Sequence, residues 1–419
     1  MIDLTIYEEA LERAVTRARE RNIIIPTFKQ QRDPSLIPPE VVERLKNVGL
    51  WDLNPLNLFR ISWHNEPVAS GGGFGSVNFI EFPRELTGVA ARIVAPVGKW
   101  FPTGAHKVGA TFGPLVEKLV RGAFDPTRQK ALWPSTGNYC RGGAFDSKLL
   151  ACESVAILPE EMSRERFEWL QGVASEVIAT PGCESNVKEI YDKCWELRRT
   201  REDVVIFNQF AEFGNAIWHY VCTGRAMEEV FATEREDDSR FAGVCLTQGS
   251  AGTLGCAEYL REVFPRLKVV AAEALQCPTL LEGGHGSHRI EGIGDKHVPW
   301  IHNIKNMDAV VGIDLTMTSM SEFLASQEVA EESTIYLYNA AGLVLAASEY
   351  MHGPETVPVQ GLVARSTQAV TRSSGCPTTF LRNLHQHLQE NSVRRAMWRP
   401  GFRRSSATLP ITIAATYFP

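Results

Sequence analysis

The sequence predicts an α/β protein with two lobes, each a mostly parallel twisted sheet flanked by helices. From residue 131 onward, short apolar runs rich in β-branched residues alternate with segments of helical periodicity, as in βαβ units. The alternation restarts after residues 233–239, a charged connector that we interpret as the exit from one lobe to the other. With 419 residues, 44% of them hydrophobic, the chain can form two domains of roughly 100–200 residues each.

The N-terminal part carries different signals. Apolar residues recur there at helical spacing, which predicts an amphipathic helix: Leu4, Tyr7, Leu11, Ala14, Val15 and Ala18. Residues 23–39 are predicted to be an extended, proline-bearing strap that leads to a short helix near residues 39–48. Asn54-Pro55-Leu56 is predicted to open a strand, and residues 92–97 form another extended run. The glycine-rich stretch 70–76 precedes no convincing helix and is predicted to be a loop.

The alternating part predicts strands and helices in turn. Strands are expected at residues 131–133, 154–158, 176–179, 204–207, 242–246 and 269–273. Helices are expected at residues 139–150, 163–173, 185–199, 213–231 and 253–264. The first lobe is therefore embedded in the second. The predicted parts are an N-terminal helix, strap and start of the large lobe (1–125) and a smaller inserted substrate lobe (126–235). They are followed by the rest of the large lobe (236–361) and an atypical Arg-rich segment (362–419).

Charge and cysteine usage narrow the class of protein. The formal net charge of −6 and the pI near 6.0 argue against a nucleic-acid partner and favour a small-molecule substrate. Nine scattered cysteines without a C-x-x-C pair favour reduced thiols in the cytoplasm over a disulfide framework or a zinc site. No apolar run approaches the roughly 18–20 residues of a membrane span, and Met1–Asn22 is charged throughout, so we expect neither export nor membrane insertion.

Lys107 is the first candidate for a reactive residue. The turn Pro102-Thr-Gly104 ends an extended run, and an apolar helical face starts at Val108, so the pattern predicts that Lys107 begins a helix. Its amine would lie beside the positive end of the helix dipole, and partial burial would lower its pKa further, toward a neutral nucleophile. The alternative is a lysine whose head reaches solvent from the first turn.

Three loops that follow predicted strands carry small or polar residues. Thr247-Gln-Gly-Ser-Ala-Gly-Thr253 could gather backbone N–H groups around a phosphate, or could be a tight turn that needs glycine for a positive φ. Ser135-Thr-Gly-Asn138 could bind a carboxylate, or could simply cap the next helix. Gln209 follows a third strand and could donate to the same carboxylate.

The stretch His288-Arg-Ile-Glu-Gly-Ile-Gly-Asp295 is a glycine-spaced loop that ends in a carboxylate. His285, His297 and His302 lie nearby in the sequence, but their spacing matches no metal-ligand motif, so no metal site is predicted. Because no G-x-S-x-G elbow accompanies these residues, serine-type hydrolysis lacks support.

Taken in this order, these stretches resemble the tryptophan synthase β and cysteine synthase superfamily, the fold-type-II enzymes that use pyridoxal 5′-phosphate. Pro102-Thr-Gly-Ala-His-Lys107 resembles the Schiff-base segment of tryptophan synthase β. Ser135-Thr-Gly-Asn138 and Gln209 are similar to the elements that bind the substrate carboxylate in cysteine synthases. Gly249-Ser-Ala-Gly-Thr253 resembles the phosphate cup of the family, and His288–Gly294 resembles a further glycine-containing loop.

The resemblance covers about residues 54–361 and implies a tryptophan synthase β-like fold with specific roles. Lys107 would hold the cofactor as a Schiff base and later move the substrate's Cα proton. The phosphate would be bound by His106, Gly249, Ser250, Ala251, Gly252 and Thr253, and Asn138 would hydrogen-bond the ring hydroxyl. The amino-acid carboxylate would be held by Ser135, Thr136, Gly137 and Gln209. Asp295 replaces a small residue of cysteine synthases, and would either act in catalysis or form a surface ion pair.

The implied activity is β-replacement or β-elimination on a small amino acid such as serine, O-acetylserine or cysteine, with sulfide entering or leaving. An indole-like nucleophile, as in tryptophan synthase β, and a dehydratase or ammonia-lyase reaction stay open. The family usually places a late serine or threonine against the pyridine nitrogen, whereas residues 362–419 hold eight arginines and one acidic residue. A catalytically silent PLP-fold binding protein is therefore the second hypothesis. Homodimers are common in the family, and we expect one here.

Overall fold

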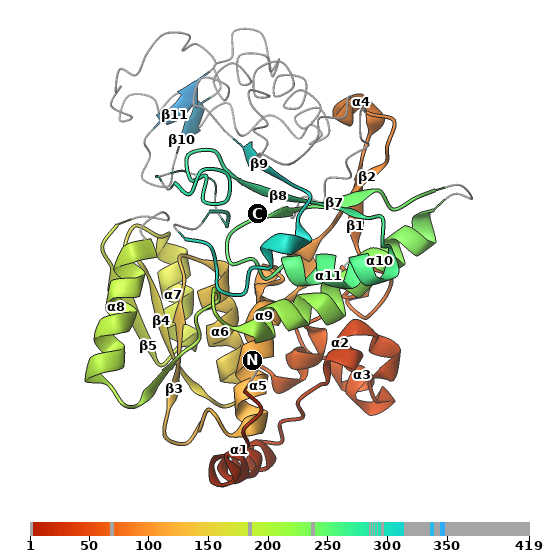
Figure 1. Ribbon diagram of the computed structural model, residues 1–419. Coiled ribbons are helices and arrows are strands. Elements are labelled where there is room, and N and C mark those ends of the chain that lie inside the picture. Colours follow the sequence, from red (N-terminus) through yellow and green to blue (C-terminus); the bar gives the residue numbers. More distant parts are fainter. Residues whose placement is uncertain are drawn as a thin grey trace. The chain divides into compact units, whose positions relative to one another are not determined.

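The computed structural model describes residues 3–67, 71–182, 187–235, 239–284, 286, 288, 290, 292–294, 297–313, 336–338 and 344–347 (Figure 1). Sequence predictions on Asp295 and on residues 362–419 lie outside these residues. The chain divides into two compact units, whose described residues fall in Met1–Glu81 and Ile93–Val311 for the first and in Phe82–Arg92 and Gly312–Pro410 for the second. Among the described residues, no helix is both long and apolar enough to cross a bilayer.

The first unit contains a four-stranded sheet with the strand order β5-β4-β3-β6, in which all neighbouring strands are parallel. Its strands are β3 (Lys130–Pro134), β4 (Glu153–Pro159), β5 (Glu176–Thr180) and β6 (Val204–Ile206). Its helices are α6 (Asn138–Leu149), α7 (Arg164–Val173) and α8 (Val187–Thr200). Leu132 packs in a cluster with Ile190 of α8, whereas Trp133 belongs to the larger core with Phe145 of α6, so successive β3 residues bury opposite faces.

A second sheet in the same unit has the order β7-β8-β9, and β7 and β8 run parallel. The strands are β7 (Gly243–Thr247), β8 (Lys268–Ala274) and β9 (Ala309–Ile313), with α11 (Leu254–Val263) in the β7 to β8 connection. Val244, Leu246 and Val269 pack with Leu260 of α11 in one apolar cluster. The fold-class prediction of two helix-flanked, mostly parallel sheets is confirmed, and every predicted strand of both sheets is correct to within one residue at each end.

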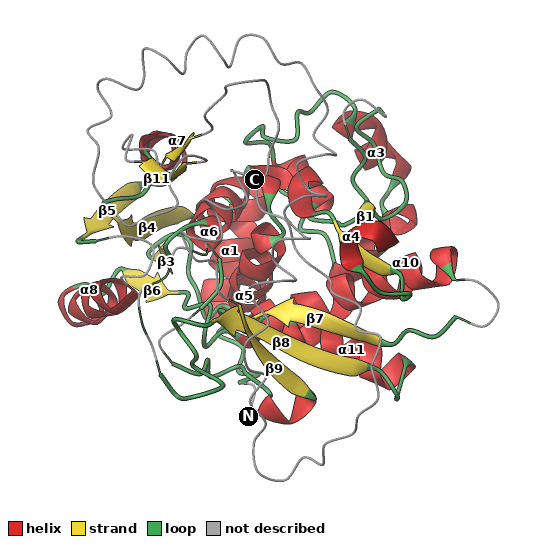
Figure 2. Cartoon of the chain, turned by 90° about the horizontal axis from the view of Figure 1, so that it is seen from above, coloured by secondary structure: helices red, strands yellow, loops and turns green. Residues whose placement is uncertain are grey.

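Helix α5 (Lys107–Arg121) lies between the two sheets (Figure 2). It packs closely on α6 and on α9 (Phe213–Trp218). A Cβ at Gly142 of α6 would lie 3.1 Å from the Lys107 carbonyl oxygen, and a Cβ at Gly113 would lie 2.2 Å from the Gly214 carbonyl oxygen of α9. The predicted continuous helix over residues 213–231 is instead α9, a π-helical turn, η6 (His219–Thr223), and α10 (Gly224–Glu234). The turn places His219 and Thr223 in the interior, where each hydrogen-bonds to a buried partner.

The N-terminal part of the first unit is built from short elements. They are α1 (Glu8–Glu20), α2 (Phe28–Arg32), η1 (Pro34–Leu36), α3 (Pro39–Leu45), η2 (Pro55–Arg60), β1 (Phe79–Phe82), β2 (Ile93–Pro96), η4 (Gly98–Trp100) and η5 (Pro102–Gly104), with η7 (Ile304–Asn306) later in the chain. The extended strap predicted over residues 23–39 is wrong in its middle, where α2 and η1 form because Thr27 accepts the Gln30 N–H and Asp33 accepts the Ser35 N–H. The strand predicted to open at Asn54 is also wrong. Asn54 Oδ1 accepts the Leu56 N–H at 3.0 Å and Pro55 pre-sets a helical φ, so a 3₁₀-helix starts there.

The described part of the second unit is small. It contains α4 (Arg84–Thr87) and the antiparallel pair β10 (Tyr336–Tyr338) and β11 (Val344–Ala347). The predicted site residues with described positions all lie in the first unit.

Candidate active site

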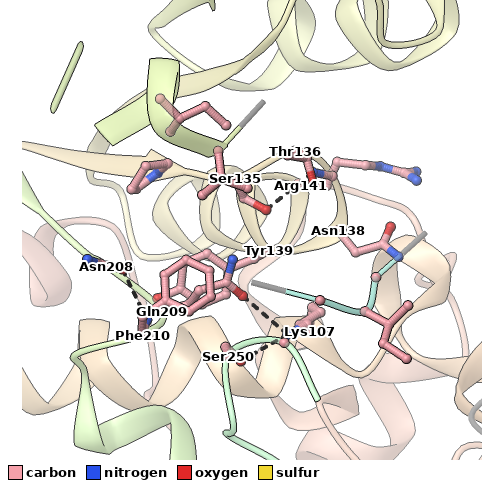
Figure 3. Close-up of a pocket in the computed structure, with 18 of the residues that line it drawn as sticks. Lys107, Ser135, Thr136, Asn138, Tyr139, Arg141, Asn208, Gln209, Phe210 and Ser250 are labelled. Atoms are coloured by element: carbon pink, nitrogen blue, oxygen red, sulfur yellow. Dashed lines mark hydrogen bonds between the residues drawn. The ribbon is translucent and has the colours of Figure 1, made fainter. Parts of the chain in front are cut away.

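Lys107 is the first residue of α5, as the sequence predicts. The η5 turn before it holds Thr103 at φ +64° and Gly104 at φ +72°, and this left-handed pair reverses the chain into the helix. Lys107 lines a cavity of about 350 Å³ (Figure 3). Eight of the residues proposed from the sequence line this cavity, namely Lys107, Ser135, Thr136, Gly137, Asn138, Gln209, Gly249 and Ser250.

The Lys107 amine is held by neutral partners. Its Nζ donates to Gln209 Oε1 at 3.3 Å and to Ser250 Oγ at 3.4 Å, as Figure 3 shows. No aspartate or glutamate is among the described residues that line the cavity. Burial, without an ion pair to offset it, lowers the pKa of Lys107 to about 8. The amine is therefore partly neutral near neutral pH, which is what a nucleophilic lysine requires.

The loop Gly249–Thr253 connects β7 to α11. Its backbone N–H groups donate to no acceptor among the described residues, which leaves consecutive donors at the start of a helix. Glycine is not needed here for a positive φ, because Ala251 takes the left-handed conformation at φ +62°. Gly252 is needed for close packing, since a Cβ there would lie 2.1 Å from Asn215 Oδ1. The loop has the donors that an anion would need.

Asn215 of α9 ties this loop to the Gln209 loop. Its Nδ2 donates to the Gln209 carbonyl oxygen at 3.1 Å and to Ser250 Oγ at 3.3 Å. Because Ser250 Oγ also accepts from Lys107, a single buried amide fixes the two residues that contact the amine.

The loop of residues 135–138 forms another wall of the cavity. Ser135 Oγ accepts the Gly137 N–H at 3.2 Å, and α6 begins at Asn138 with no side chain capping it. The first N–H groups of α6 therefore have no acceptor within the helix and carry its positive partial charge. The loop after β6 contributes Gln209. Its side chain and these N–H groups together make the wall suited to a carboxylate.

His106 and Thr253 do not line the Lys107 cavity. Both line a separate cavity of about 20 Å³, together with His219 and Thr223. The His106 ring stacks on Trp63 at 5.9 Å and meets His219 edge-on at 5.2 Å. Burial, and secondarily the neighbouring Lys107 charge, lowers the pKa of His106 to about 3, so its ring is neutral at physiological pH.

Other sequence candidates are placed as follows. His288 and the glycines of its loop, Gly292 and Gly294, line the Lys107 cavity, whereas Asp295 lies outside the described residues. Ala251 and Gly252 are not among the residues that line the cavity. Sequence reasoning missed several lining residues, namely Trp51, Tyr139, Arg141, Arg166 and Tyr191. Only Arg141 carried a signal, because it follows Asn138 by three residues on the same helix and so shares its face.

Comparisons with known proteins identify the family of the chain. The family model described as pyridoxal-phosphate dependent enzyme matches residues 100–358, more than half of the chain. The chain is 31% identical over 219 residues to a cysteine synthase of Staphylococcus aureus (strain Mu50), covering 51% of this chain and 67% of the relative. It is 25% identical over 264 residues to a probable cysteine synthase of Bacillus subtilis (strain 168), covering 62% and 81%.

Solved structures show the same fold. The crystal structure of a cysteine synthase from Entamoeba histolytica matches with a TM-score of 0.53 at 18% identity, covering 74% of this chain and 92% of that one. A hydrogen sulfide-producing enzyme from Fusobacterium nucleatum matches with a TM-score of 0.52 at 21% identity, covering 60% and 79%.

The fold and site thus define a pyridoxal-phosphate dependent enzyme, and the chain belongs to that family. It acts at the β-carbon of an amino acid, with pyridoxal 5′-phosphate as its cofactor. The residues present fit this cofactor, because an amine of lowered pKa lines the same cavity as a loop whose N–H groups have no acceptor among the described residues.

Proposed function

We propose that the protein catalyses a cysteine synthase-like reaction, in which a substituent on the β-carbon of a small amino acid is replaced, with sulfide as the nucleophile or leaving group. The observation that carries the proposal is the contact of Lys107 Nζ with both Gln209 and Ser250. The loop that would bind the phosphate and the wall that would bind the carboxylate thereby each contribute a residue in contact with one amine. The cysteine synthases among the relatives support the choice of reaction.

Lys107 has two proposed roles. Its Nζ would hold the cofactor covalently and, once released from that bond, would accept the Cα proton of the substrate and later return it. When bound, pyridoxal 5′-phosphate supplies an electron sink for the charge that develops at Cα. A pKa of about 8 suits both directions of proton transfer near neutral pH.

The cofactor's phosphate would be bound by the N–H groups of residues 249–253, which have no competing acceptor among the described residues. His106 and Thr253 would support this end from the small neighbouring cavity. Asn138 would hydrogen-bond the ring hydroxyl, since its amide lines the Lys107 cavity.

The substrate carboxylate would be bound by Ser135, Thr136, Gly137 and Gln209. All four line the cavity. The first three directly precede α6, whose dipole favours an anion, and Gln209 lies in the loop after β6. We further propose that Asp295 acts in catalysis. The proposal also includes a cytoplasmic location, a homodimer, and division of the chain at residues 125, 235 and 361.

The test is a spectrum followed by a substrate panel. Purified protein reconstituted with pyridoxal 5′-phosphate is expected to absorb in the visible. Serine, O-acetylserine and cysteine are then added in turn, with sulfide present for the first two, and cysteine, sulfide and pyruvate are measured. Cysteine formed from O-acetylserine and sulfide supports the proposal. A protein that binds no cofactor, or that binds it and turns over none of the three amino acids, contradicts it.

A further inference from the structure

Two arginines line the candidate active site, and none of the described lining residues is a carboxylate that could neutralise them. Arg141 comes from α6 and Arg166 from α7, and both line the Lys107 cavity; Figure 3 draws Arg141 among the lining residues. Neither makes an ion pair with an aspartate or glutamate of the described residues. Since Lys107 and the N-terminus of α6 are also there, the described cavity wall is strongly electropositive.

Arg141 is held by aromatic rings instead of by acceptors. Its guanidinium carbon lies 5.4 Å from the Trp51 ring and 5.3 Å from the Trp169 ring, and the two rings meet edge to face at 6.3 Å. Its buried Nε donates to no acceptor among the described residues. Burial, with a contribution from the like charge of Arg166, lowers the pKa of Arg141. The two indoles thus position a guanidinium whose hydrogen-bonding capacity is unused.

Arg166 is fastened to the proposed carboxylate loop. Its Nη1 donates to the Thr136 carbonyl oxygen at 3.1 Å, and a Cβ at Gly137 would lie 3.4 Å from the same nitrogen. Its charge therefore acts at the loop that would bind the substrate. A guanidinium has five N–H donors, and these contacts use Nη1. The two N–H groups of Nη2 are left to donate to a phosphate or a carboxylate.

We propose that Arg141 and Arg166 bind a second anionic group of the substrate, carried on its β-carbon, so that the preferred donor is O-phosphoserine and not a neutral ester. This inference rests on the proposed function. None of the described lining residues is a carboxylate, and the substrate's α-carboxylate supplies one negative charge against two guanidinium charges. The described part of this partly buried site would then keep an excess of positive charge, which is costly. A phosphate ester supplies the missing charge with oxygens that a bidentate arginine recognises.

The reaction balances without an oxidant or reductant. The Cβ–O bond of phosphoserine breaks with its electron pair on the departing phosphate, and the sulfur of sulfide forms the new bond to Cβ. Lys107 Nζ takes the Cα proton and returns it to the same carbon. Overall, phosphoserine and hydrogen sulfide become cysteine and hydrogen phosphate.

The same two arginines would also suit an anionic nucleophile that enters after the donor has reacted. The test therefore follows the donor alone, by the change in the visible spectrum when O-phosphoserine or O-acetylserine is added to the cofactor-loaded enzyme without any nucleophile. Both donors pass through the same Lys107 chemistry, so only the group on Cβ differs between them.

Three variants are compared with the wild type: Arg141→Gln, Arg166→Gln and the control Arg164→Gln. Arg164 lies on α7 two residues before Arg166, with a side chain 90% exposed, and it does not line the cavity. We expect the wild type to prefer O-phosphoserine at least about tenfold in apparent second-order rate constant. Arg141→Gln and Arg166→Gln should each lower that constant by about 10–100-fold for O-phosphoserine and by less than about threefold for O-acetylserine.

Equal losses for both donors in either arginine variant, or a wild type that prefers the neutral ester, would overturn the inference. So would arginine variants that react with O-phosphoserine as fast as the wild type does. Loss of the visible band in a glutamine variant marks misfolding. Arg141→Lys, which keeps the charge, is then measured instead. A rate with O-phosphoserine near that of the wild type supports the inference, and a low rate in a variant that keeps the band contradicts it. A wild type that reacts with neither donor, and also turns over neither serine nor cysteine, contradicts the proposed function itself. One that reacts with O-acetylserine, serine or cysteine but not with O-phosphoserine contradicts this inference alone.

Discussion

Lys107 and His106 are consecutive residues at the start of α5, yet their side chains enter different environments. Lys107 lines a cavity of about 350 Å³ with polar walls, whereas His106 lines one of about 20 Å³ between Trp63 and His219. Burial lowers the pKa of both groups, to about 8 for the lysine and to about 3 for the histidine. A lowered pKa therefore does not by itself mark a reactive group, because room for a second molecule is also needed.

The wall between the two environments is the loop Gly249–Thr253. Gly249 and Ser250 line the Lys107 cavity, while Thr253 lines the small one. Changes on the lysine side should thus alter cofactor binding and turnover, and changes on the histidine side should alter stability first. Each prediction below tests that contrast.

The largest effect is expected for Lys107→Ala. The variant should lose the visible band of the cofactor-loaded protein and at least about a thousandfold of turnover, because no other described lysine lines the cavity. Absorbance and product formation are the measurements. Lys46→Ala, which removes an exposed lysine paired with Glu43, serves as the control and should change neither. A Lys107→Ala protein that keeps its band would remove the lysine from its proposed role.

The pKa of Lys107 should also be visible in stability. Its folded pKa of about 8 lies below the usual 10.5, so the unfolded chain binds more protons between these two pH values. The cofactor-free wild type should accordingly become more stable, relative to Lys107→Met, as pH rises from about 8 to about 10.5, by at most about 3 kcal/mol. Urea unfolding of both proteins measures the difference. A difference that does not change over this pH range would mean that the lysine is solvated.

The separating loop should be sensitive at one glycine and tolerant at another. Gly252→Ala places a Cβ 2.1 Å from Asn215 Oδ1 and should cost about 1–3 kcal/mol of unfolding free energy, with weaker cofactor binding. Gly249→Ala meets nothing closer than 3.5 Å, so it should change stability by less than about 0.5 kcal/mol while occupying cavity space. Denaturation and cofactor titration of the pair would check this, and equal destabilisation would contradict it.

The histidine side is probed by Thr223→Val. Thr223 Oγ1 accepts from Trp63 Nε1 at 3.0 Å and lies 2.8 Å from His219 Nδ1, so the isosteric change leaves two buried ring nitrogens without that partner. The expected cost is about 1–2 kcal/mol of stability, with the visible band of the loaded protein retained. Thermal unfolding and absorbance together decide. Loss of the band at unchanged stability would place the cluster in the cofactor site proper.

Most of the architecture was predictable because it depends on local patterns. Strands β3 to β8 and their helices follow from apolar runs bounded by small or charged residues. The prediction failed at Asn54, where an apolar-looking stretch is a 3₁₀-helix because a side-chain oxygen accepts from the backbone two residues later. It was incomplete over residues 213–231, where a buried π turn interrupts the helix.

The candidate site was predictable in part for the same reason. Ser135 and Gln209 follow β3 and β6, which pair in parallel, so their loops lie at one edge of that sheet. Lys107 and Gly249 lie at helix starts that follow a turn and a strand of the other sheet, so local patterns predict these junctions but not that they meet. Arg166 was not predictable, since it reaches the site only through the packing of α7 beside the Ser135 loop.

By itself, therefore, the sequence determined the order of strands β3 to β8 and their helices, the helix start at Lys107 and the loops that follow these strands, because each depends on residues close together in the chain. Only the tertiary structure decided that His106 turns away into a closed cluster, that Ala251 rather than a glycine takes the left-handed position, and that two tryptophans hold Arg141 at the cavity. Those outcomes depend on which side chains distant in sequence exclude water and compete for the same space.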